Sequence, residues 1–408
     1  MMIELARKAK EAALITQSLP ESTRARALNS IAQALIRETE SILSENANDL
    51  EAGKKDGLTA AMMDRMTLSQ NSLAAISESV ISIANQDSVI GTVDSSYTRP
   101  NGLLIEKVRI PLGVIGMIFE SRPNVVIDGA ALAIKSGNSI ILKGGKEAQH
   151  SNAILHKIVQ EAIKDILPEA SVQMVSTRED IFELLKLSDY IDLMVPRGGS
   201  ALIQFVKKHA TMPVVAHDKG LCHVYVHADA DTKIVAPIVV NSKAHRPGVC
   251  NAAETLLMHK DYPQKKEVLA ALAQAGIELR GDEATKDLHP HVKLATKEDY
   301  ETEYLDKVMS VKIVQDEKEA LVHIKTFGSH HTEAILARDA KTIELFLNSL
   351  DASCLVVNAS TRFNDGGELG LGAELGISTS KLHAYGPMGA KEMTTTRFVV
   401  KGTGQIRS

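Results

Sequence analysis

Residues 245–254, HRPGVCNAAE, place one cysteine directly after a Pro-Gly turn. Free cysteine is usually a small buried apolar residue, and this interpretation fits Cys222 and Cys354, which lie inside apolar β-like segments. Cys250 differs because Arg246 and a histidine precede it, and a nearby cation lowers the pKa of a thiol by favouring the thiolate. These residues leave a nucleophile and a core position as equal alternatives for Cys250.

Two further features of this stretch bear on its local structure. Pro247 and Gly248 supply a turn, and Asn251 and Glu254 have the spacing of a capping box. The pattern therefore predicts that a turn holds Cys250 in front of a short helix.

Two glycine pairs end β-like segments, in IILKGGKEA at 140–148 and in LMVPRGGSALIQF at 193–205. A glycine between a strand and a helix lets the backbone approach a ligand, and the helix N-terminus offers unpaired N–H groups to phosphate. Neither pair matches the GxGxxG or Walker pattern, so a plain left-handed turn is an equal alternative at each. Lys143 and Lys146 flank the first pair and predict contacts to the phosphate of an adenosine, with two solvated lysines as the alternative.

The remaining polar clusters do not predict a metal site. Cys222, Cys250 and Cys354 lie far apart without a CxxC pair, which argues against a disulfide framework and against structural zinc. FGSHHTEAI at 327–335 carries two adjacent histidines and a glutamate, but chain neighbours point in different directions and no further ligand stands at a familiar spacing. We expect this segment to contact substrate or to form a surface loop.

The composition is that of a globular protein of two or three domains. The chain has 408 residues, with 46 basic and 51 acidic side chains, and this balance shows no preference for nucleic acid. The first twenty residues spread charges through a helical pattern and lack the apolar core of a secretion signal. The apolar run IPLGVIGMIF at 110–119 is too short to cross a bilayer. We expect a cytoplasmic protein without membrane contact.

The elements that must position these residues follow from the periodicity. Residues 1–85 have helical spacing, and residues 91–112 contain a Pro-Asn-Gly turn between β-leaning segments, which predicts a protruding hairpin. Short apolar runs then alternate with helical stretches, first up to residue 215 and again over 216–358, which predicts βαβ units and mostly parallel sheets. A glycine-rich segment follows, and TTRFVVKGTG closes the chain as one β-like segment.

Taken together, these stretches resemble the γ-glutamyl phosphate reductase family, the glutamate-5-semialdehyde dehydrogenases of proline biosynthesis, within the aldehyde dehydrogenase superfamily. The resemblance runs nearly end to end and is carried by five segments. They are GVIGMIFESRPNVVIDGAALAIKSGNSIILKGGKEA, VPRGG, NSKAHRPGVCNAAETLLMH, VHIKTFGSHHTEAI and GGELGLGAELGISTSKLHAYGPMG.

The resemblance implies an aldehyde-dehydrogenase-like α/β fold with two doubly wound α/β domains and a small β oligomerisation element. The NADPH-binding domain is expected to comprise 1–215 with 359–384, and the catalytic domain 216–358. The oligomerisation element is expected to comprise 91–112 and 385–408. The resemblance also implies a homo-oligomer, either a dimer or a dimer of dimers.

For the activity, the resemblance implies NADPH-dependent reduction of L-glutamyl 5-phosphate to L-glutamate 5-semialdehyde, with release of phosphate. Cys250 matches the family's catalytic cysteine, which attacks the acyl carbon and forms a thioester that hydride from NADPH reduces. Asn124 lies near the oxyanion-stabilising asparagine of the superfamily, and a backbone N–H near Cys250 is expected to complete the oxyanion hole. Contacts to the substrate are expected from Arg122, Arg246 and His331.

For the cofactor NADPH/NADP⁺, the resemblance implies two glycine loops and one carboxylate. Lysine contacts in the first loop suit the 2′-phosphate of NADPH. Glu303, in ETEYLDKV, matches the glutamate that holds the nicotinamide ribose. The expected cofactor-binding residues are Lys143, Gly144, Gly145, Lys146, Gly198, Gly199, Ser200 and Glu303.

Three departures from related sequences bear on function. Ordinary aldehyde dehydrogenases carry a Glu-Leu-Gly-Gly motif whose glutamate activates the water that hydrolyses the thioester, whereas this chain reads HDKG at 217–220. An acyl-phosphate reductase needs no such base, because hydride consumes its thioester. Phe327 stands where histidine or tyrosine is usual, and Tyr385 where arginine is usual. The loss of an arginine affects substrate affinity if the position faces an anion, and only assembly if it lies at a subunit contact.

Three alternatives remain open from the sequence. The first is an aldehyde dehydrogenase that acts on another small acyl phosphate or aldehyde. The second is a cysteine hydrolase or acyltransferase that pairs Cys250 with His331, which predicts turnover without NADPH and leaves both glycine pairs unexplained. The third is a non-catalytic scaffold, which predicts a buried and unreactive Cys250. Because the acyl phosphate is unstable, direct transfer from glutamate 5-kinase is a further expectation about partners.

Overall fold

The structure is a computed structural model that describes residues 1–216 and 219–407. The contacts within the chain divide these residues into two compact units. Unit 1 contains residues 1–216, 370–376 and 382–407, and unit 2 contains residues 219–369 and 377–381. Among the residues described, no helix is long and apolar enough to cross a membrane.

A four-stranded parallel sheet in the order β5-β4-β3-β6 forms the centre of unit 1. Every residue of β3 is buried, because a parallel strand is covered by helices on both of its faces. The strands are β3 (Val114–Phe119), β4 (Ser139–Gly144), β5 (Val172–Val175) and β6 (Leu193–Arg197).

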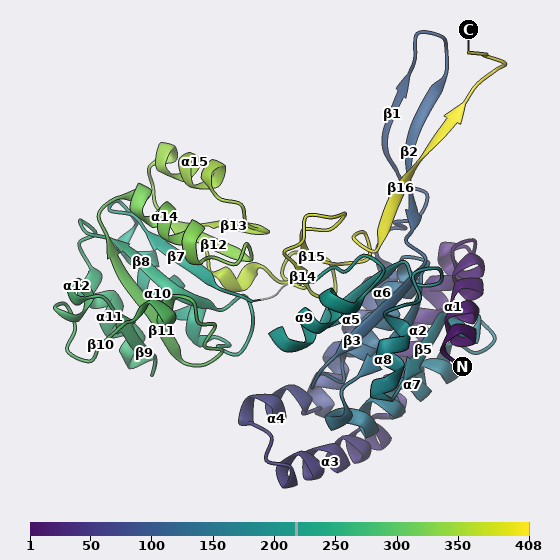
Figure 1. The fold of residues 1–408 in the computed structure, drawn as a ribbon, viewed down its shortest axis with the longest axis horizontal. Coiled ribbons are helices and arrows are strands. Elements are labelled where there is room, and N and C mark those ends of the chain that lie inside the picture. Colours follow the sequence, from purple (N-terminus) through teal and green to yellow (C-terminus); the bar gives the residue numbers. More distant parts are fainter. Residues whose placement is uncertain (217–218, 408) are drawn as a thin grey trace. The chain divides into compact units, whose positions relative to one another are not determined.

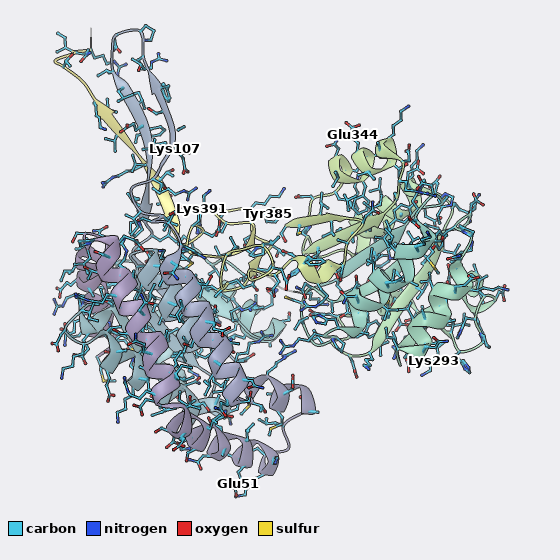
Figure 2. All side chains as sticks on the ribbon, turned by 180° about the vertical axis from the view of Figure 1, so that it is seen from behind. Glu51, Lys107, Lys293, Glu344, Tyr385 and Lys391 are labelled. Carbon is cyan, nitrogen blue, oxygen red and sulfur yellow. The ribbon has the colours of Figure 1, made fainter. Side chains whose placement is uncertain are left out.

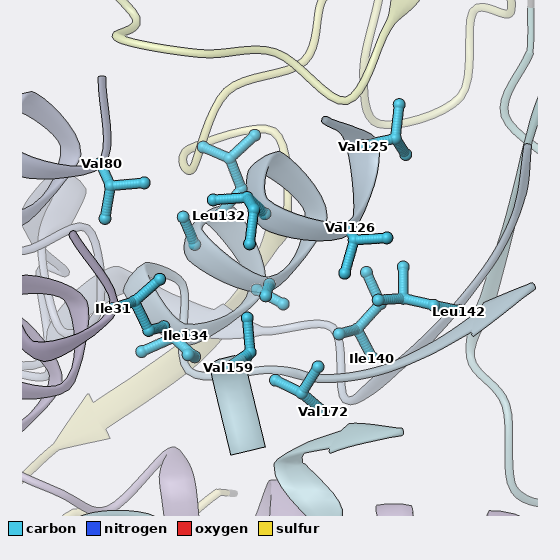
Figure 3. Close-up of a cluster of buried hydrophobic side chains, with 14 of the residues drawn as sticks. Ile31, Val80, Val125, Val126, Leu132, Ile134, Ile140, Leu142, Val159 and Val172 are labelled. Carbon is cyan, nitrogen blue, oxygen red and sulfur yellow. The ribbon is translucent and has the colours of Figure 1, made fainter. Parts of the chain in front are cut away.

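Helices cover both faces of this sheet. Helices α6 and α7 pack on one face with α2 and α5 over them, and α1, α8 and α9 lie on the other face. Helix α6 is almost wholly buried because it is enclosed between the sheet and this outer helical layer, and Figure 3 shows its side chains meeting those of β4. The elements are α6 (Val125–Lys135), η1 (Lys146–Ala148), α7 (Gln149–Ile163), η2 (Glu169–Ser171), α8 (Arg178–Leu184) and α9 (Ser200–His209).

The helical pattern predicted for residues 1–85 is confirmed. Five helices occupy this region. They are α1 (Met2–Thr16), α2 (Glu21–Arg37), α3 (Thr39–Lys55), α4 (Ala60–Met66) and α5 (Gln70–Asn85).

The predicted hairpin is confirmed as strands β1 (Val93–Thr98) and β2 (Leu104–Pro111), which pair antiparallel. Gly102 has a φ of 85° in the connecting turn, a backbone region that favours glycine. The closing β-like segment forms β16 (Thr394–Lys401), which pairs antiparallel with β2. Figure 1 shows these three strands projecting from the helices of unit 1.

Unit 2 is built on a seven-stranded parallel sheet in the order β10-β9-β11-β8-β7-β12-β13. Helices α10 and α11 share one buried cluster with the sheet, and α14 and α15 share another. Both units are therefore doubly wound α/β structures, as predicted.

The elements of unit 2 alternate along the chain. The strands are β7 (Cys222–Val226), β8 (Ala253–His259), β9 (Glu278–Gly281), β10 (Lys293–Leu294), β11 (Val308–Val314), β12 (Thr332–Leu336) and β13 (Cys354–Val357). The helices are α10 (Thr232–Ala244), α11 (Lys265–Gln274), α12 (Glu283–Lys286), α13 (Lys297–Tyr300), α14 (Glu317–Phe327), α15 (Ala340–Ser349) and the short η3 (Thr361–Phe363). Two strands of two residues follow along the chain, β14 (Ile377–Ser378) in unit 2 and β15 (Gly386–Pro387) in unit 1.

One boundary differs from the expectation. Residues 359–384 were expected in the first domain, whereas residues 359–369 and 377–381 belong to unit 2. The hydroxyl of Ser360 hydrogen-bonds a serine of α10, and the side-chain amide of Asn364 donates to Thr332 at 2.8 Å. Polar contacts of this kind have no periodicity, so the sequence pattern does not show them.

Candidate active site

A cavity of about 680 Å³ opens at the carboxyl ends of β3, β4 and β6 in unit 1. This volume lies in the range of pockets that hold a drug-sized molecule or a cofactor. One wall is apolar and consists of side chains from α8 and α9, which are Ile181, Phe182, Leu202 and Phe205. Such a wall suits the flat face of an adenine ring.

The strand order explains why a pocket forms at this place. The chain runs from β3 outward to β4 and β5 on one side, and β6 lies on the other side of β3. The loops that leave β3 and β6 therefore diverge, and the crevice at such a switch point is where open α/β sheets bind ligands. The loop after β4 carries the first predicted glycine pair, and the loop after β6 carries the second.

The glycine pairs do not form left-handed turns. The φ angle is −62° at Gly145 and −68° at Gly199, both ordinary for any residue. A Cβ at Gly144 would instead overlap with the side-chain amide of Asn152, so glycine is needed there because another group approaches closely. The alternative of a plain left-handed turn is therefore wrong at both pairs.

The charged groups of the cavity differ in their burial and in their partners. Lys143 is nearly buried and Lys146 is exposed, and within residues 1–216 and 219–407 neither lysine forms an ion pair with a carboxylate. The carboxylate of Glu147 accepts the backbone N–H of Ser121 at 2.6 Å and its hydroxyl at 2.9 Å. The two lysines thus remain available for an anionic ligand.

The predicted oxyanion residue lies at the start of α6 in unit 1. The side-chain amide of Asn124 donates to the carboxylate of Asp128 at 2.8 Å. Burial raises the pKa of Asp128 to about 6, while the bond from Asn124 opposes this rise. Arg122 precedes Asn124 in the same turn and is half-buried.

In unit 2, Cys250 lies partly exposed in the turn before β8, so the predicted turn is confirmed. Strands β7, β8 and β12 are parallel and begin at the same edge of the sheet. Their starting residues, Cys222 on β7 and Thr332 on β12, therefore lie close to the turn that carries Cys250. The partial exposure does not support the core interpretation of this cysteine.

A second cysteine, Cys222, contacts the backbone of Cys250. The thiol of Cys222 donates to the carbonyl oxygen of Cys250 at 3.2 Å. Burial raises the pKa of Cys222 well above its usual value, so this thiol stays protonated and inert, which agrees with its predicted core position. Nδ1 of His331 lies 3.6 Å from the same sulfur and 2.8 Å from the hydroxyl of Thr332.

His331 itself is fully buried. This burial argues against the direct substrate contact predicted for it, because a substrate cannot reach a side chain that has no accessible surface. Its contacts instead place it beneath the turn of Cys250, where it supports Cys222.

A glycine and a glutamate complete the support of this turn. A Cβ at Gly220 would overlap with the backbone of Cys250, so only glycine fits at this position. The N–H of Gly220 donates to Oε1 of Glu303 at 2.9 Å, which places this predicted cofactor residue beside the turn that carries Cys250. Of the HDKG sequence that replaces the hydrolytic motif, residues 217–218 lie outside those the structure describes.

The helix predicted after the turn is wrong, because residues 253–259 form β8. Glu254 does not cap a helix; its carboxylate binds Nζ of Lys243 at 2.6 Å in the interior and accepts the N–H of Leu305 at 3.3 Å. Asn251 donates to the carbonyl of Asn364 at 2.9 Å. Both side chains of the apparent capping box, Asn251 and Glu254, therefore bind residues that are distant in sequence.

Two arginines lie near Cys250 in unit 2. Arg246, predicted from the sequence, is exposed on the same turn. Arg362, which the sequence analysis missed, is half-buried and interacts electrostatically with both Cys250 and Arg246. Burial lowers the pKa of Arg362, and its Nε lies 3.4 Å from Nδ1 of His245. No motif marks this arginine, because it is distant from Cys250 in sequence.

The two departures from the related sequences lie in different units. Phe327 ends α14 in unit 2, and its ring packs on His323 and Tyr300 with centroid separations of 4.6 and 5.7 Å. It therefore fills a position in an aromatic cluster. Tyr385 lies half-buried in the C-terminal segment of unit 1 (Figure 2).

Comparison with known proteins defines the class. The sequence pattern of the aldehyde dehydrogenase family matches residues 2–302 of this chain. The chain belongs to the aldehyde dehydrogenase family. This membership makes it an oxidoreductase with a small-molecule substrate and implies a nicotinamide cofactor.

Within this family, the chain is similar over its full length to γ-glutamyl phosphate reductases. It is 46% identical over 408 residues to the γ-glutamyl phosphate reductase of Geobacter metallireducens, with 99% of this chain and 98% of the relative covered. It is also 46% identical to that of Xanthomonas campestris, with 99% of each chain covered. The crystal structure of γ-glutamyl phosphate reductase from Thermotoga maritima matches with a TM-score of 0.95 at 39% identity and covers 100% of both chains. The predicted resemblance and the aldehyde-dehydrogenase-like α/β fold are confirmed.

Proposed function

We propose that the protein reduces L-glutamyl 5-phosphate to L-glutamate 5-semialdehyde with NADPH and releases phosphate, the second step of proline biosynthesis. The observation that carries this proposal is the match, over the whole chain, to γ-glutamyl phosphate reductases. The partly exposed Cys250, held in its turn by contacts to its backbone, supplies the nucleophile that this reaction requires.

Cys250 forms and releases the covalent intermediate. Its thiolate attacks the acyl carbon of the substrate, the bond to the phosphate oxygen breaks, and phosphate leaves with the electron pair, so that a thioester remains. NADPH, when bound, supplies the hydride that reduces this thioester. The carbon–sulfur bond then breaks, and the aldehyde leaves while the thiolate is restored.

Several polar groups of the chain have assigned roles in this reaction. Asn124 and a backbone N–H near Cys250 stabilise the oxyanion. Arg122 and Arg246 bind the anionic groups of the substrate, and Arg362 adds a third cation whose charge acts on Cys250. His331 supports the nucleophile segment through Cys222 and has no substrate contact, in keeping with its burial.

The cavity of unit 1 fits a nicotinamide dinucleotide. The apolar wall from α8 and α9 suits adenine, and Lys143 and Lys146 suit the 2′-phosphate that distinguishes NADPH from NADH. Gly144, Gly145, Gly198, Gly199 and Ser200 form the two loops that border the cavity, and Glu303 in unit 2 is assigned to the nicotinamide ribose.

The described part of the loop before β7 also suits a reductase. Lys219 and Gly220 offer no carboxylate that could activate water, and Gly220 is instead packed on Cys250. A reductase needs no such base, because hydride consumes its thioester.

The proposal is tested by running the reaction backwards from glutamate 5-semialdehyde and NADP⁺, with and without phosphate, while NADPH formation is followed by absorbance. We expect formation that depends on phosphate and is lost in Cys250→Ala. Cys354→Ala, which changes a partly buried cysteine at the start of β13, is the matched control and keeps its activity.

Other outcomes correspond to the remaining alternatives. Formation of NADPH without phosphate indicates an ordinary hydrolytic dehydrogenase. Acyl transfer or hydrolysis by Cys250 without nicotinamide indicates a cysteine hydrolase, and activity that survives in Cys250→Ala contradicts the proposed nucleophile.

The substrate's instability favours direct transfer from glutamate 5-kinase. The acyl phosphate decomposes in water, so a complex of the two enzymes would protect it. Coupled flux through the purified pair should exceed the flux expected for free diffusion, and equal flux would count against a complex.

A further inference from the structure

We propose that Glu120 is an internal anion that occupies the diphosphate-binding position of the unit 1 cavity and is displaced when the dinucleotide binds. This inference rests on the proposed function, which places the cofactor in that cavity. In this role, the carboxylate of Glu120 lies in the cofactor cavity and opposes binding of the dinucleotide.

The contact of Glu120 places its charge at the switch point of the sheet. Glu120 directly follows β3, and its Oε2 accepts the N–H of Gly199 at 2.9 Å. Gly199 is the N-cap of α9, a helix of ten residues, so the carboxylate lies at the positive end of the helix dipole. A Cβ at Gly198 would overlap with the same carboxylate, so the glycine pair leaves the space that Glu120 fills.

The surrounding charges show that this position suits an anion from outside. Lys143 and Lys146, assigned above to the 2′-phosphate, line the same cavity, and among the described residues no carboxylate pairs with either of them. Both cavity carboxylates, Glu120 and Glu147, are bound to backbone N–H groups instead. Within the part of the chain that the structure describes, the cavity therefore presents two lysines without a paired carboxylate and a backbone N–H that its own Glu120 occupies.

Glu120 is the carboxylate that can leave. Its side chain is exposed, so it can swing into water without crossing a packed interior. Glu147, by contrast, is half-buried and receives two hydrogen bonds from Ser121, so it is held in place. The two acidic residues of the cavity therefore differ in mobility.

The dinucleotide binds more weakly because its diphosphate must first displace the carboxylate of Glu120. A diphosphate gains the N–H of Gly199 only when Glu120 gives it up, and the released carboxylate then lies near a negatively charged ligand. This effect should ease release of NADP⁺ after each turnover. A ligand that binds the adenosine end without a diphosphate is unaffected.

The test compares Glu120→Gln with the native protein by equilibrium binding of two probes, NADP⁺ and adenosine 2′-monophosphate. Glutamine keeps the size of the side chain and removes its charge. We expect the Kd for NADP⁺ to fall about two- to fivefold, the effect of one charge at a helix terminus, and the Kd for adenosine 2′-monophosphate to remain unchanged. Glu183→Gln, at an exposed glutamate of α8, is the matched control and changes neither value.

An unchanged or weaker affinity of Glu120→Gln for NADP⁺ would overturn the inference, because it would show that the carboxylate is neutral or helps to bind the cofactor. Lys146→Met separates this failure from failure of the proposed function. If Lys146→Met leaves the affinity for adenosine 2′-monophosphate unchanged, the placement of the cofactor in this cavity is wrong, and this inference falls with it. Thermal unfolding of each variant verifies that the fold is retained.

Discussion

Lys243 and Glu254 form an ion pair in the interior of unit 2, and this pair also anchors the segment that follows Glu303. Nζ of Lys243 lies 2.6 Å from Glu254, whose other oxygen accepts the N–H of Leu305. Burial raises the pKa of Glu254 to about 7, while Lys243 opposes this rise. Lys243→Met leaves an uncompensated carboxyl in the interior and should lower the free energy of unfolding by about 3–5 kcal/mol in denaturant titrations.

A second variant distinguishes the charge from the packing. Lys243→Met combined with Glu254→Gln replaces the pair by two neutral side chains and keeps an acceptor for the N–H of Leu305. We expect this double variant to recover most of the lost stability. A double variant as unstable as Lys243→Met would show that the loss came from packing alone.

His323 should make unit 2 sensitive to acid. Burial, together with nearby His223 and Lys312, lowers the pKa of His323 from 6.5 to about 3. The folded state therefore binds fewer protons than the unfolded state between about pH 3 and 6.5, so stability rises with pH across that interval and falls on acidification. The cost at pH 5 is about 2 kcal/mol.

The measurement is the free energy of unfolding between pH 5 and 7. In His323→Leu the decline toward pH 5 should be smaller by about 2 kcal/mol, because the variant has no proton to take up. His291→Leu changes an exposed histidine of the same unit and serves as the control. An equal decline in His323→Leu would mean that other groups cause the acid sensitivity.

One of the N-terminal helices of residues 1–85 holds the start of α7, which follows the first glycine loop. The buried carboxylate of Asp49 on α3 accepts the N–H groups of His150 and Ser151 at 3.1 and 2.8 Å. It thereby caps α7 from another helix. Asp49→Ala should cost about 1–2 kcal/mol of stability and weaken NADP⁺ binding, because the loop that carries Lys146 loses its anchor.

Equilibrium binding and thermal unfolding measure these two effects. Asp56→Ala removes an exposed aspartate at the end of the same helix and is the matched control. If Asp49→Ala loses stability but binds NADP⁺ with native affinity, the cap does not organise the cofactor loop.

The elements also show where local patterns suffice. The hairpin was predictable because Asn-Gly chemistry and β-branched flanks act over a few residues. The helix expected after Cys250 was wrong because a spacing of three residues is equally compatible with a strand. The buried Lys243 and the partner strands of β8 decided in favour of the strand, and both lie outside the local window.

The three-stranded sheet of β1, β2 and β16 has an apolar face that is exposed to solvent. The strand pairings place Tyr97, Ile105 and Val400 in one row, and Phe398 two residues along on the same face. Phe398 is 66% exposed and Val400 is 56% exposed. Clustered exposed apolar side chains on a projecting sheet are typical of an association surface, in agreement with the predicted homo-oligomer.

Phe398→Asp with Val400→Asp should therefore reduce the assembled mass in sedimentation or light-scattering experiments. Charges on this face would have to be buried without partners in the oligomer. Leu14→Asp, at an apolar residue of α1 that is 62% exposed, is the control and leaves the mass unchanged. A native mass for the double variant would mean that another surface joins the subunits.

The α/β alternation, the hairpin and the turn that carries Cys250 could be predicted from the amino-acid order, because periodicity and turn chemistry are local properties of the chain. The folded structure was needed to see that Glu120 contacts Gly199, that Asn124 donates to Asp128 and that Arg362 lies near Cys250. Most of these partners are far apart along the chain and meet because the order of parallel strands brings separate loops to one edge of a sheet. The burial of His331 has the same origin, since packing of neighbouring strands decides which histidine of an adjacent pair reaches solvent.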